Sequence, residues 1–414
     1  MVMGSRKSQL ILYFALFFCG MSQCKQTIAG SIPKTPVPTP DPKPKESPGV
    51  VAPAKKPKTG TKELRALWMT NTGSQALSSA ANTKEALQKI QKAGFNTAYV
   101  VVWNKGYTLY PSDVAQKATG QKFFPGQGLE GRDLLAEMIQ ETKSSQLEIV
   151  PWFEYGLKTL KESPLAQRNP DWFLKKQDGS LIEFTHNTEF QIMNPSHPQV
   201  KKFIVDLAVE CVKKYEVSSI QFDDHFAIGK EFGYQSDWLL EFKNQAGGTA
   251  APPPDNPEWV KFRANKVTSL FREVVQAVRA ARPGIKISHS PNPHGFAFRT
   301  SQQDWATWVR EGLVDELVVQ LYRDSEEALN NEIASPELQE AKQKIPVSIG
   351  LYSGRSDKKI PVTTLESQAK FVRRKGLAGF AFFFYESVFH ISPDSPQERI
   401  QKLGVLMAGP SFAP

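Results

Sequence analysis

The 414-residue sequence predicts an α/β fold that consists of a single (β/α)8 TIM barrel. Short, near-continuously apolar runs alternate with helical patterns, as expected for parallel strands buried on both faces. The predicted helix-to-strand links are short, whereas long strand-to-helix loops follow the second, third and fourth strands, at 104–130, 154–196 and 224–256. Polar and aromatic residues gather at one end of the apolar runs, which is the end where such barrels carry their sites.

Each predicted strand is a run of aliphatic, β-branched and aromatic residues bounded by turn-forming residues. The predicted strands are Leu64–Met69, Thr97–Trp103, Leu147–Phe153, Ser218–Asp223, Ile285–Ser290, Glu316–Tyr322, Pro346–Tyr352 and Gly379–Tyr385. A helical pattern follows each strand, and these helices are predicted to begin near Thr83, Gly131, His197, Pro257, Gln302, Glu326, Thr363 and Pro396.

Residues 1–24 are typical of an export signal, because Arg6 and Lys7 precede an apolar run too short to span a bilayer comfortably. Cys24 is a candidate for lipid attachment, although Gln23 replaces the small residue that normally precedes a lipidated cysteine. Plain cleavage by signal peptidase and an uncleaved anchor are the alternatives. We therefore predict an exported protein, periplasmic or extracellular, that the lipid or the anchor would hold at the membrane.

The segment 25–62 is rich in Pro and Lys, with nine prolines between 31 and 58, and has too few large apolar groups to fold. Residues 1–62 hold ten basic and two acidic residues, which leaves 41 basic and 40 acidic residues of the totals of 51 and 42. The domain predicted at 63–408 is therefore close to neutral. This balance gives no support for a nucleic-acid partner.

The sequence contains no Gly-rich phosphate loop, no HExxH helix and no G-x-S-x-G elbow, and its three cysteines lack the spacing of a zinc site. Cys211 lies in an apolar helical pattern and is predicted to be a buried free thiol. We predict no cofactor and no metal. A metal-dependent hydrolase using Asp224, His225 and His289 is a weaker alternative.

The fourth predicted strand runs directly into Asp223, Asp224 and His225. Successive side chains of a strand point to opposite faces, so both carboxylates cannot lie in the core. Paired carboxylates perform glycosidic cleavage: one protonates the leaving oxygen and the other attacks the anomeric carbon or activates water. We predict that Asp224 is the central catalytic carboxylate and that Asp223 orients it or shares its charge. A solvated strand cap is the alternative.

A partner carboxylate has to come from another strand end. Glu386, after the eighth strand, is the predicted second carboxylate, and Glu154, after the third, is its reserve. Asp324 is also available. The alternatives are that Glu386 pairs with a cation such as Arg323 and that Glu154 is a loop carboxylate without chemistry.

Aromatic rings can stack on the apolar faces of sugars, and amide, guanidinium and imidazole groups can fix their hydroxyls. We therefore predict a polysaccharide partner, although any single Trp would also suit the core. The predicted substrate-binding residues are Trp68, Asn71, Trp103, Asn104, Tyr107, Trp152, His225, His289, Asn292, Gln320, Tyr322, Arg323, Tyr352 and Tyr385.

A set of segments occurs in order along the chain: ELRALWMTN, FNTAYVVVWNKGYTLYPS, GLEGRDLLAEMI, VPWFEYG, SIQFDDHF, SHSPNPHGFAF, QDWATWVREGLVDELVVQLYR and GFAFFFYES. With these segments, the stretch from about Glu63 to Glu386 resembles the bacterial glycosyl-hydrolase-like family ten domain. The resemblance implies a TIM-barrel fold and an envelope glycosidase, and one relative acts on peptidoglycan glycan strands stripped of their stem peptides. It also places the aspartate pair at Asp223 and Asp224.

The end of the seventh strand, Gly350 to Ser353, lacks the glutamate that the large clan of retaining barrel glycosidases uses as its nucleophile. We therefore do not transfer that mechanism, and a strand-four nucleophile, as in amylase-like barrels, is the nearer analogy. The main hypothesis is an exported glycoside hydrolase that cleaves peptidoglycan glycan. The alternative is a non-catalytic glycan-binding protein on a hydrolase scaffold.

Overall fold

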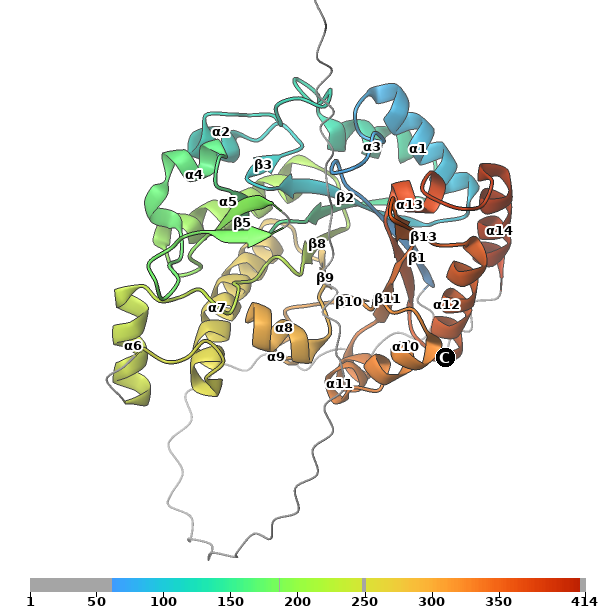
Figure 1. Cartoon of the computed structure of the whole chain (residues 1–414). Helices are drawn as coiled ribbons and strands as arrows, with labels where there is room; N and C mark the ends of the chain where they lie inside the picture. The colour runs from blue at the N-terminus through green and yellow to red at the C-terminus, as the bar shows by residue number, and fades with distance from the viewer. Residues whose placement is uncertain (1–61, 186, 248–250, 410–414) are drawn as a thin grey trace, which may run out of the picture.

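A computed structural model of the chain describes residues 62–185, 187–247 and 251–409. Within these residues, eight parallel strands form a barrel (Figure 1). In chain order they are β1 (Leu64–Met69), β2 (Thr97–Asn104), β4 (Glu148–Phe153), β8 (Ser219–Asp223), β9 (Lys286–Ser290), β10 (Glu316–Gln320), β11 (Val347–Tyr352) and β14 (Gly379–Phe383). The hydrogen-bonded order is β1-β14-β11-β10-β9-β8-β4-β2, and β1 also pairs with β2, so the barrel is closed. The predicted (β/α)8 fold is confirmed, whereas the predicted signal and linker fall almost wholly on 1–61, outside the described residues.

Helices surround the barrel (Figure 1). They are α1 (Ala80–Lys92), α3 (Leu134–Thr142), α5 (Pro198–Lys214), α7 (Pro257–Ala281), α9 (Trp305–Arg310), α10 (Glu326–Ile333), α11 (Pro336–Lys344), α12 (Val362–Arg374) and α14 (Pro396–Ala408). Several begin with proline in the first turn, where its missing N–H costs no helical hydrogen bond. None of the helices in the described part of the chain combines the length and the apolarity needed to cross a membrane.

The loops at the C-terminal ends of the strands carry additional elements. The loop after β2 holds β3 (Tyr107–Thr108) and α2 (Asp113–Thr119), and the loop after β8 holds α6 (Ser236–Ala246). The loop after β4 holds an antiparallel sheet of β5 (Lys158–Leu160), β7 (Thr188–Ile192) and β6 (Glu183–Thr185), together with α4 (Pro164–Arg168) and η1 (Pro170–Trp172). The smaller additions are α8 (His294–Ser301), β12 (Gly354–Arg355), β13 (Lys358–Lys359) and α13 (Tyr385–Phe389).

A buried arginine holds the loop that follows β8. The side chain of Arg263, on α7, is inaccessible to solvent and donates hydrogen bonds to the carbonyl oxygens of Lys230, Phe232 and Pro254. Buried backbone carbonyls need such partners, because an unpaired polar group away from water is costly. Arg263 therefore fixes the course of a loop that begins at the end of β8.

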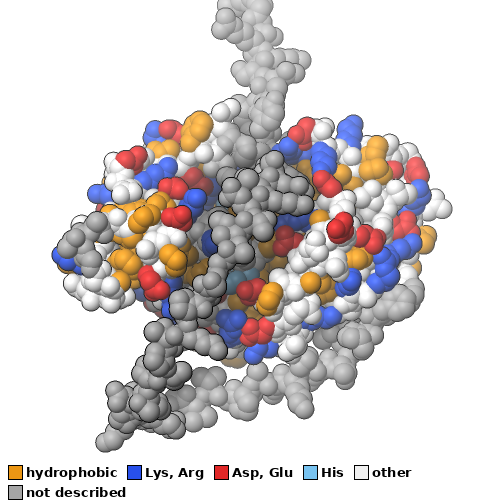
Figure 2. All heavy atoms as spheres, turned by 60° about the horizontal axis from the view of Figure 1, so that its bottom comes forward, with side chains coloured by type: hydrophobic (Ala, Val, Ile, Leu, Met, Phe, Trp, Pro, Cys, Tyr) orange, Lys and Arg blue, Asp and Glu red, His pale blue; other side chains and the backbone are white. Residues whose placement is uncertain are grey.

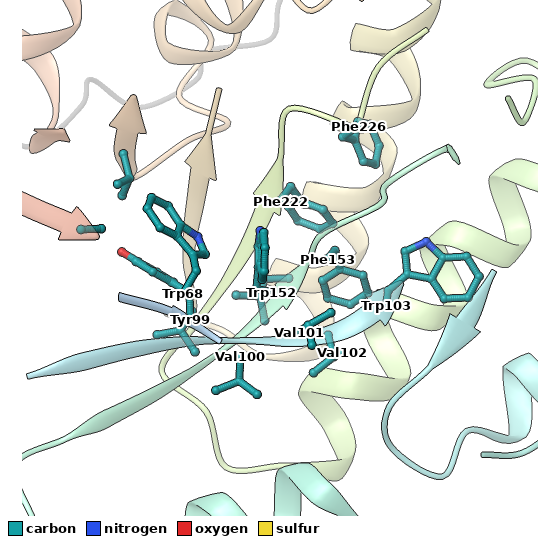
Figure 3. Packing of buried hydrophobic residues seen from close by; sticks show 14 of the residues in the cluster. Trp68, Tyr99, Val100, Val101, Val102, Trp103, Trp152, Phe153, Phe222 and Phe226 are labelled. Atoms are coloured by element: carbon teal, nitrogen blue, oxygen red, sulfur yellow. The ribbon is translucent and has the colours of Figure 1, made fainter. Parts of the chain in front are cut away.

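A chain of polar side chains crosses the barrel interior. Trp68 Nε1 donates to Gln221 Oε1 at 2.8 Å, and Gln221 Nε2 donates to Ser288 Oγ at 3.0 Å. Ser288 Oγ and the Tyr99 hydroxyl both donate to Glu316 Oε1 at 2.9 Å. Figure 3 shows Trp68 and Tyr99 lying side by side, with ring centroids 5.5 Å apart. These directional contacts fix the relative heights of β1, β8 and β9, and so the level at which the last residues of β8 emerge.

The eighth strand ends earlier than predicted. It stops at Phe383 rather than Tyr385, because a helical turn begins immediately afterwards. The Ser387 hydroxyl accepts from Phe384 N and donates to Phe384 O, both at 2.9 Å. Tyr385 and Glu386 therefore lie on the short helix α13 and not on the strand.

Two other predicted boundaries also differ. The helix predicted near Gln302 is replaced by α8 and α9, and Gln302 ends α8 in a left-handed conformation with φ of 47°. The Asp304 side chain then caps α9 by accepting from Thr307 N at 3.2 Å. The sixth strand ends at Gln320, so Tyr322 lies in the following loop.

The first and last elements of the barrel are joined at its N-terminal end. Arg373 Nε donates to Glu63 Oε1 at 2.7 Å, in an ion pair whose side chains are less than a tenth exposed. The Arg65 guanidinium donates to the carbonyl oxygen of Met407, near the end of α14. The start of β1 and the end of α14 therefore lie together, at the end of the barrel opposite the C-terminal ends of the strands.

Candidate active site

Asp223 and Asp224 occupy different surroundings at the end of β8. Asp223 points into the barrel and is 4% exposed, and its Oδ1 accepts from Ser290 Oγ at 2.8 Å and Gln320 Nε2 at 2.7 Å. Asp224 comes one residue later, and its Oδ2 accepts from Asn292 Nδ2 at 2.6 Å. Its side chain keeps 22% exposure. One carboxylate is therefore buried in the barrel, while the other can reach a molecule bound at the mouth.

His225 joins this pair to the neighbouring strand. Its Nδ1 lies 3.1 Å from Asp224 Oδ1, 3.9 Å from Asp223 Oδ2 and 3.1 Å from the carbonyl oxygen of Glu154. The imidazole stacks on Tyr155, with ring centroids 4.8 Å apart and planes within 6°. The stacking and the shared Nδ1 fix the position of the imidazole.

Glu154 brings a third carboxyl group to the same end of the barrel. It follows β4, which pairs with β8 through Phe153 and Phe222. Its Oε2 accepts from Thr70 Oγ1 at 2.9 Å and from Asn104 Nδ2 at 2.5 Å, and the residue is 3% exposed. The ends of β1, β2 and β4 therefore converge on this carboxyl group.

The surroundings move the pKa values of these groups in different directions. Burial, followed by the charge of Asp224, raises the pKa of Asp223 to about 7, and burial raises the pKa of Glu154 to about 6. Burial opposes ionisation of Asp224, but the charge of His225 and the hydrogen bonds from His225 and Asn292 outweigh it and lower the pKa of Asp224. Burial also acts against a charged His225, but Asp224 and the hydrogen bonds raise the pKa of this imidazole to about 10. Near pH 7, an ionised Asp224 therefore faces a cationic His225, while Asp223 is close to the midpoint of its own titration.

Aromatic rings continue from the site onto the small sheet of the β4 loop. Tyr155 stacks on Phe190 of β7, with centroids 5.9 Å apart. Two ammonium groups lie over these rings: Lys105 Nζ is 5.3 Å from the centroid of Tyr155, and Lys158 Nζ is 4.6 Å from that of Phe190. A cation placed over the face of an aromatic ring is attracted by the electrons of that ring. The small sheet is thus coupled by stacking to His225.

The visible face in Figure 2 carries acidic and basic side chains interspersed, without a large block of one sign. A histidine side chain shows in a hollow near its centre. This distribution agrees with the near-neutral composition of the part that follows residue 62.

Comparison with known proteins places the chain in a family. The sequence model of the family described as Glycosyl hydrolase-like 10 matches residues 63–373, which is most of the chain. The chain belongs to the glycosyl hydrolase-like 10 family. The chain is 27% identical over 299 residues to Glycosyl hydrolase YngK of Bacillus subtilis (strain 168), covering 63% of this chain and 54% of that protein. It is 25% identical over 259 residues to Glycosyl hydrolase DigH of Escherichia coli (strain K12), covering 58% and 57%. The matched region spans about half the length of these curated relatives.

Solved structures show that this family member shares the fold of barrel glycosidases. The PgaB (BpsB) glycoside hydrolase domain from Bordetella bronchiseptica superposes with a TM-score of 0.59 at 10% identity, covering 81% of this chain and 100% of that domain. The catalytic domain of β-amylase from Paenibacillus polymyxa gives 0.57 at 12% identity, covering 84% and 99%. At such identities the likeness is one of fold.

Three tryptophans predicted to stack on sugar lie instead in the core of this glycosyl hydrolase-like 10 protein. Trp68 and Trp152 are 1% exposed inside the barrel, with ring centroids 6.3 Å apart. Trp103 is fully buried against Phe203 of α5, and Figure 3 shows it apart from the other two. The register of β2 with β4 shifts between Val101 and Trp103, and this bulge turns Trp103 toward the helices. The three indoles therefore do not reach the mouth of the barrel.

His289 also lies away from the site. It is on the outward face of β9, fully buried, with its Nδ1 3.0 Å from Phe222 O and its ring against Phe271 and Trp308. Burial lowers its pKa to about 4. The next residue, Ser290, is the one that faces inward to Asp223. The predicted substrate contact of His289 is therefore contradicted by the alternation of the strand.

Glu386 stands at the rim of the barrel. Its Oε1 accepts from Ser74 Oγ at 2.7 Å and from Gln75 N at 3.0 Å, so it holds the loop after β1. Asp324 is largely exposed and pairs with Lys358 at 2.6 Å. The contacts of these two carboxylates are with loop segments, whereas the backbone carbonyl oxygen of Glu154 lies 3.1 Å from His225 Nδ1.

Of the other predicted substrate-binding residues, some contact the carboxyl groups of the site and others do not. Asn104, Asn292 and Gln320 are hydrogen-bonded to the carboxyl groups described above. Tyr107 is half-buried, Tyr385 packs in α13 and is 3% exposed, and Arg323 pairs with Glu332 of α10 at 2.6 Å. The rings of Tyr322 and Tyr352 pack together with centroids 5.8 Å apart. Burial and then the charges of the two aspartates raise the pKa of Tyr322 well above its usual value.

Sequence reasoning missed two residues that shape the aspartate pair. Gln303 is fully buried, and its Nε2 donates to the carbonyl oxygens of Asp223, Asp224 and Phe226 at 3.2–3.3 Å. It thereby fixes the turn that follows β8. Ser290 was not among the predicted contacts, whereas its neighbour His289 was, although Ser290 lies opposite Asp223 in the register of β8 and β9. Gln303 lies far along the chain after α8, and no local pattern connects it to the pair.

Asp223, Asp224 and His225 offer potential ligand atoms within 4.8 Å of one another. Asp224 Oδ2 is already bonded by Asn292, and both oxygens of Asp223 lie within the contacts described above. His289, the third member of the predicted metal set, faces the helices. The set predicted for a metal-dependent hydrolase is therefore not assembled.

Proposed function

We propose that this chain is an exported glycoside hydrolase that cleaves a cell-envelope polysaccharide, with peptidoglycan glycan strands as its substrate. The observation that carries the proposal is the arrangement of carboxyl groups at the ends of β4 and β8, in which the pKa of the buried Glu154 is raised and that of the more exposed Asp224 is lowered. Glycoside hydrolysis needs one carboxyl group that holds a proton and another that is ionised. The family membership and the glycosyl hydrolase names of two relatives support the same class of reaction.

In this proposal Asp224 is the ionised carboxylate that meets the anomeric carbon or activates a water molecule against it. It keeps access to the mouth of the barrel, and Asn292 and His225 orient its two oxygens. The positive charge of His225 favours the ionised form. Below about pH 7 Asp223 holds a proton and so avoids a second negative charge beside Asp224, while Ser290 and Gln320 fix its place.

We assign the proton donor to Glu154 ahead of Glu386, which reverses the order proposed from sequence. Burial keeps part of Glu154 protonated near neutral pH, since its pKa is raised to about 6. Its carbonyl oxygen also shares His225 Nδ1 with Asp224. Glu386 instead uses an oxygen to hold Ser74 and Gln75.

The envelope substrate rests on the N-terminal sequence and on the family resemblance. Arg6 and Lys7 followed by an apolar run are typical of an export signal, and the Pro-rich segment 25–62 suits a spacer between an envelope attachment and the barrel. Aromatic and amide side chains at the mouth provide contacts of the kind a polysaccharide requires. Export and the identity of the glycan are both parts of the proposal.

The test is the release of soluble fragments from purified, peptide-free glycan strands, detected by mass spectrometry. We expect fragments from the wild type and a loss of at least about a thousandfold in rate for Asp224→Asn. Asp206→Asn is the matched control, since Asp206 lies on the outer helix α5 paired with Lys202, and it should keep wild-type activity. Wild-type activity of Asp224→Asn would refute the assignment.

Two further measurements separate the alternatives. Binding of the wild type to purified sacculi without product from any glycan would favour a glycan-binding protein. Loss of activity after treatment with a chelator, restored by a metal, would favour a metal-dependent hydrolase. We expect activity that the chelator leaves unchanged.

A further inference from the structure

A small pocket lies at the rim of the barrel, between the loop after β1 and the loop after β2. It has a volume of about 80 Å³, and its lining includes Asn71, Ser74, Leu77, Gln127 and Leu129. Pockets that enclose a whole small-molecule ligand occupy roughly 300–1,000 Å³. This pocket therefore suits a single substituent rather than a sugar ring.

The pocket contains a buried hydrogen-bond acceptor without a donor. Asn71 is 4% exposed, and its Nδ2 donates to Gln127 Oε1 at 3.0 Å. Its Oδ1 has no hydrogen-bond partner among residues 62–185, 187–247 and 251–409. Buried polar atoms are nearly always paired, so this oxygen is poised for an N–H or O–H group of a ligand.

The remaining walls are partly apolar. Leu77 and Leu129 are 1% and 2% exposed and line the same space. A group that satisfies this lining must present a donor to Asn71 Oδ1 and an apolar end to the two leucines. An acetamido group has both, in its N–H and its methyl. A hydroxyl group would leave the leucine wall unfilled, and an ammonium group would place a charge against it.

The pocket is adjacent to the proposed proton donor. Thr70, the residue before Asn71, donates its hydroxyl to Glu154 Oε2 at 2.9 Å. Asn104, which also donates to Glu154, lies 3.4 Å from the Thr72 hydroxyl on the other side of Asn71. The residues on either side of Asn71 thus contact Glu154 and its hydrogen-bond partner Asn104.

We propose that this pocket binds the acetamido group of an N-acetylhexosamine unit of the glycan. The N–H donates to Asn71 Oδ1, and the methyl group lies against Leu77 and Leu129. This inference rests on the proposed function, because the sugar occupies the same site. It makes Asn71 a specificity-determining residue that selects N-acetylated over N-deacetylated glycans.

The experiment measures binding by calorimetry in an Asp224→Asn background, so that no turnover occurs. The probes are a tetramer of N-acetylglucosamine and the same tetramer of glucosamine. We expect the N-acetylated tetramer to bind at least about tenfold more tightly, the gain of one hydrogen bond and a buried methyl group. Adding Asn71→Leu should abolish this preference by weakening the N-acetylated tetramer alone.

A second variant guards against misfolding of the first. Ser78 also lines the pocket and is only half-buried, so Ser78→Leu fills the space without altering Asn71. It should cause the same selective loss, with thermal unfolding close to that of the parent. Equal weakening of both tetramers by both variants, or no weakening of either, would overturn the inference. A preference that persists in a protein without turnover on any glycan would refute the proposed function and leave the pocket standing.

Discussion

Removal of the Ser290 hydroxyl should move the alkaline limb of the pH–activity profile upward. In the wild type, Ser290 Oγ and Gln320 Nε2 both donate to Asp223 Oδ1, at 2.8 and 2.7 Å. A hydrogen bond to a charged group contributes about 1.5–3 kcal/mol, and about 1.36 kcal/mol corresponds to one pKa unit. Gln320 remains in Ser290→Ala and limits the effect, so we expect the pKa of Asp223 to rise by about one unit from about 7.

The assay is kcat/KM for fragment release from a soluble glycan between about pH 5 and pH 10, because this ratio reports groups of the free enzyme. Activity should fall as Glu154 loses its proton near pH 6 and more steeply as Asp223 loses its own near pH 7, and this steeper part of the fall should begin about one pH unit later in Ser290→Ala. Ser288→Ala is the matched control: it removes a hydroxyl from the same strand and the same inward face, but one that bonds Gln221 and Glu316. An unmoved limb in Ser290→Ala, or one that moves to lower pH, would refute the assignment of the proton to Asp223.

Three other outcomes are expected. Glu154→Gln should lower kcat by about 10²–10⁴-fold and Glu386→Gln far less, and the reverse order in a steady-state assay would return the proton donor to Glu386. Arg263→Met should lower the free energy of unfolding in urea by on the order of 3–5 kcal/mol, because it leaves several buried carbonyls of the loop after β8 unpaired; a loss below about 1 kcal/mol would contradict this role. Asp223 binds a proton in the folded state up to about pH 7 and in the unfolded state only up to about pH 4, so the free energy of unfolding of the wild type should decrease as the pH rises from about 4 to about 7. Urea titrations at each pH should show a smaller decrease for Asp223→Asn, and an equal decrease would contradict the raised pKa.

The barrel itself could be predicted from the sequence because its strands are buried on both faces. Such strands are continuous apolar runs, and their alternation with helices leaves few other architectures. The predicted boundaries were wrong at the ends of some strands and helices, because local hydrogen bonds determine where such an element starts or stops. The Ser387 hydroxyl caps a helix that begins at Tyr385, and the aromatic run GFAFFFY does not indicate this helix. Gln302 adopts a left-handed conformation and so divides one predicted helix into α8 and α9.

The candidate site was predicted in part, and the misplaced residues share one physical cause. The sequence shows which residues end a strand but does not by itself show which of two neighbours faces the interior. Ser290 faces Asp223 and His289 does not, because the register of β9 with β8 decides between them. For Trp103, a bulge reverses the direction that simple alternation gives. The small pocket at Asn71 depends on two loops that are separated along the chain, so no local pattern indicates it.

The contacts that join β1 to the end of α14 lie at the N-terminal end of the barrel, here called its floor, which is opposite the mouth that carries the candidate site. Glu63, Arg65, Arg373 and Met407 bring both ends of the described domain to the floor, while the carboxyl groups of the site stand at the mouth. A surface, a fused protein or a neighbouring domain attached at either end would therefore sit beneath the barrel and leave its opening unobstructed. A long, insoluble polymer could then approach from the outside without passing the attachment. The same proximity of ends makes the domain a candidate for circular permutation, in which a short peptide would join residue 409 to residue 62.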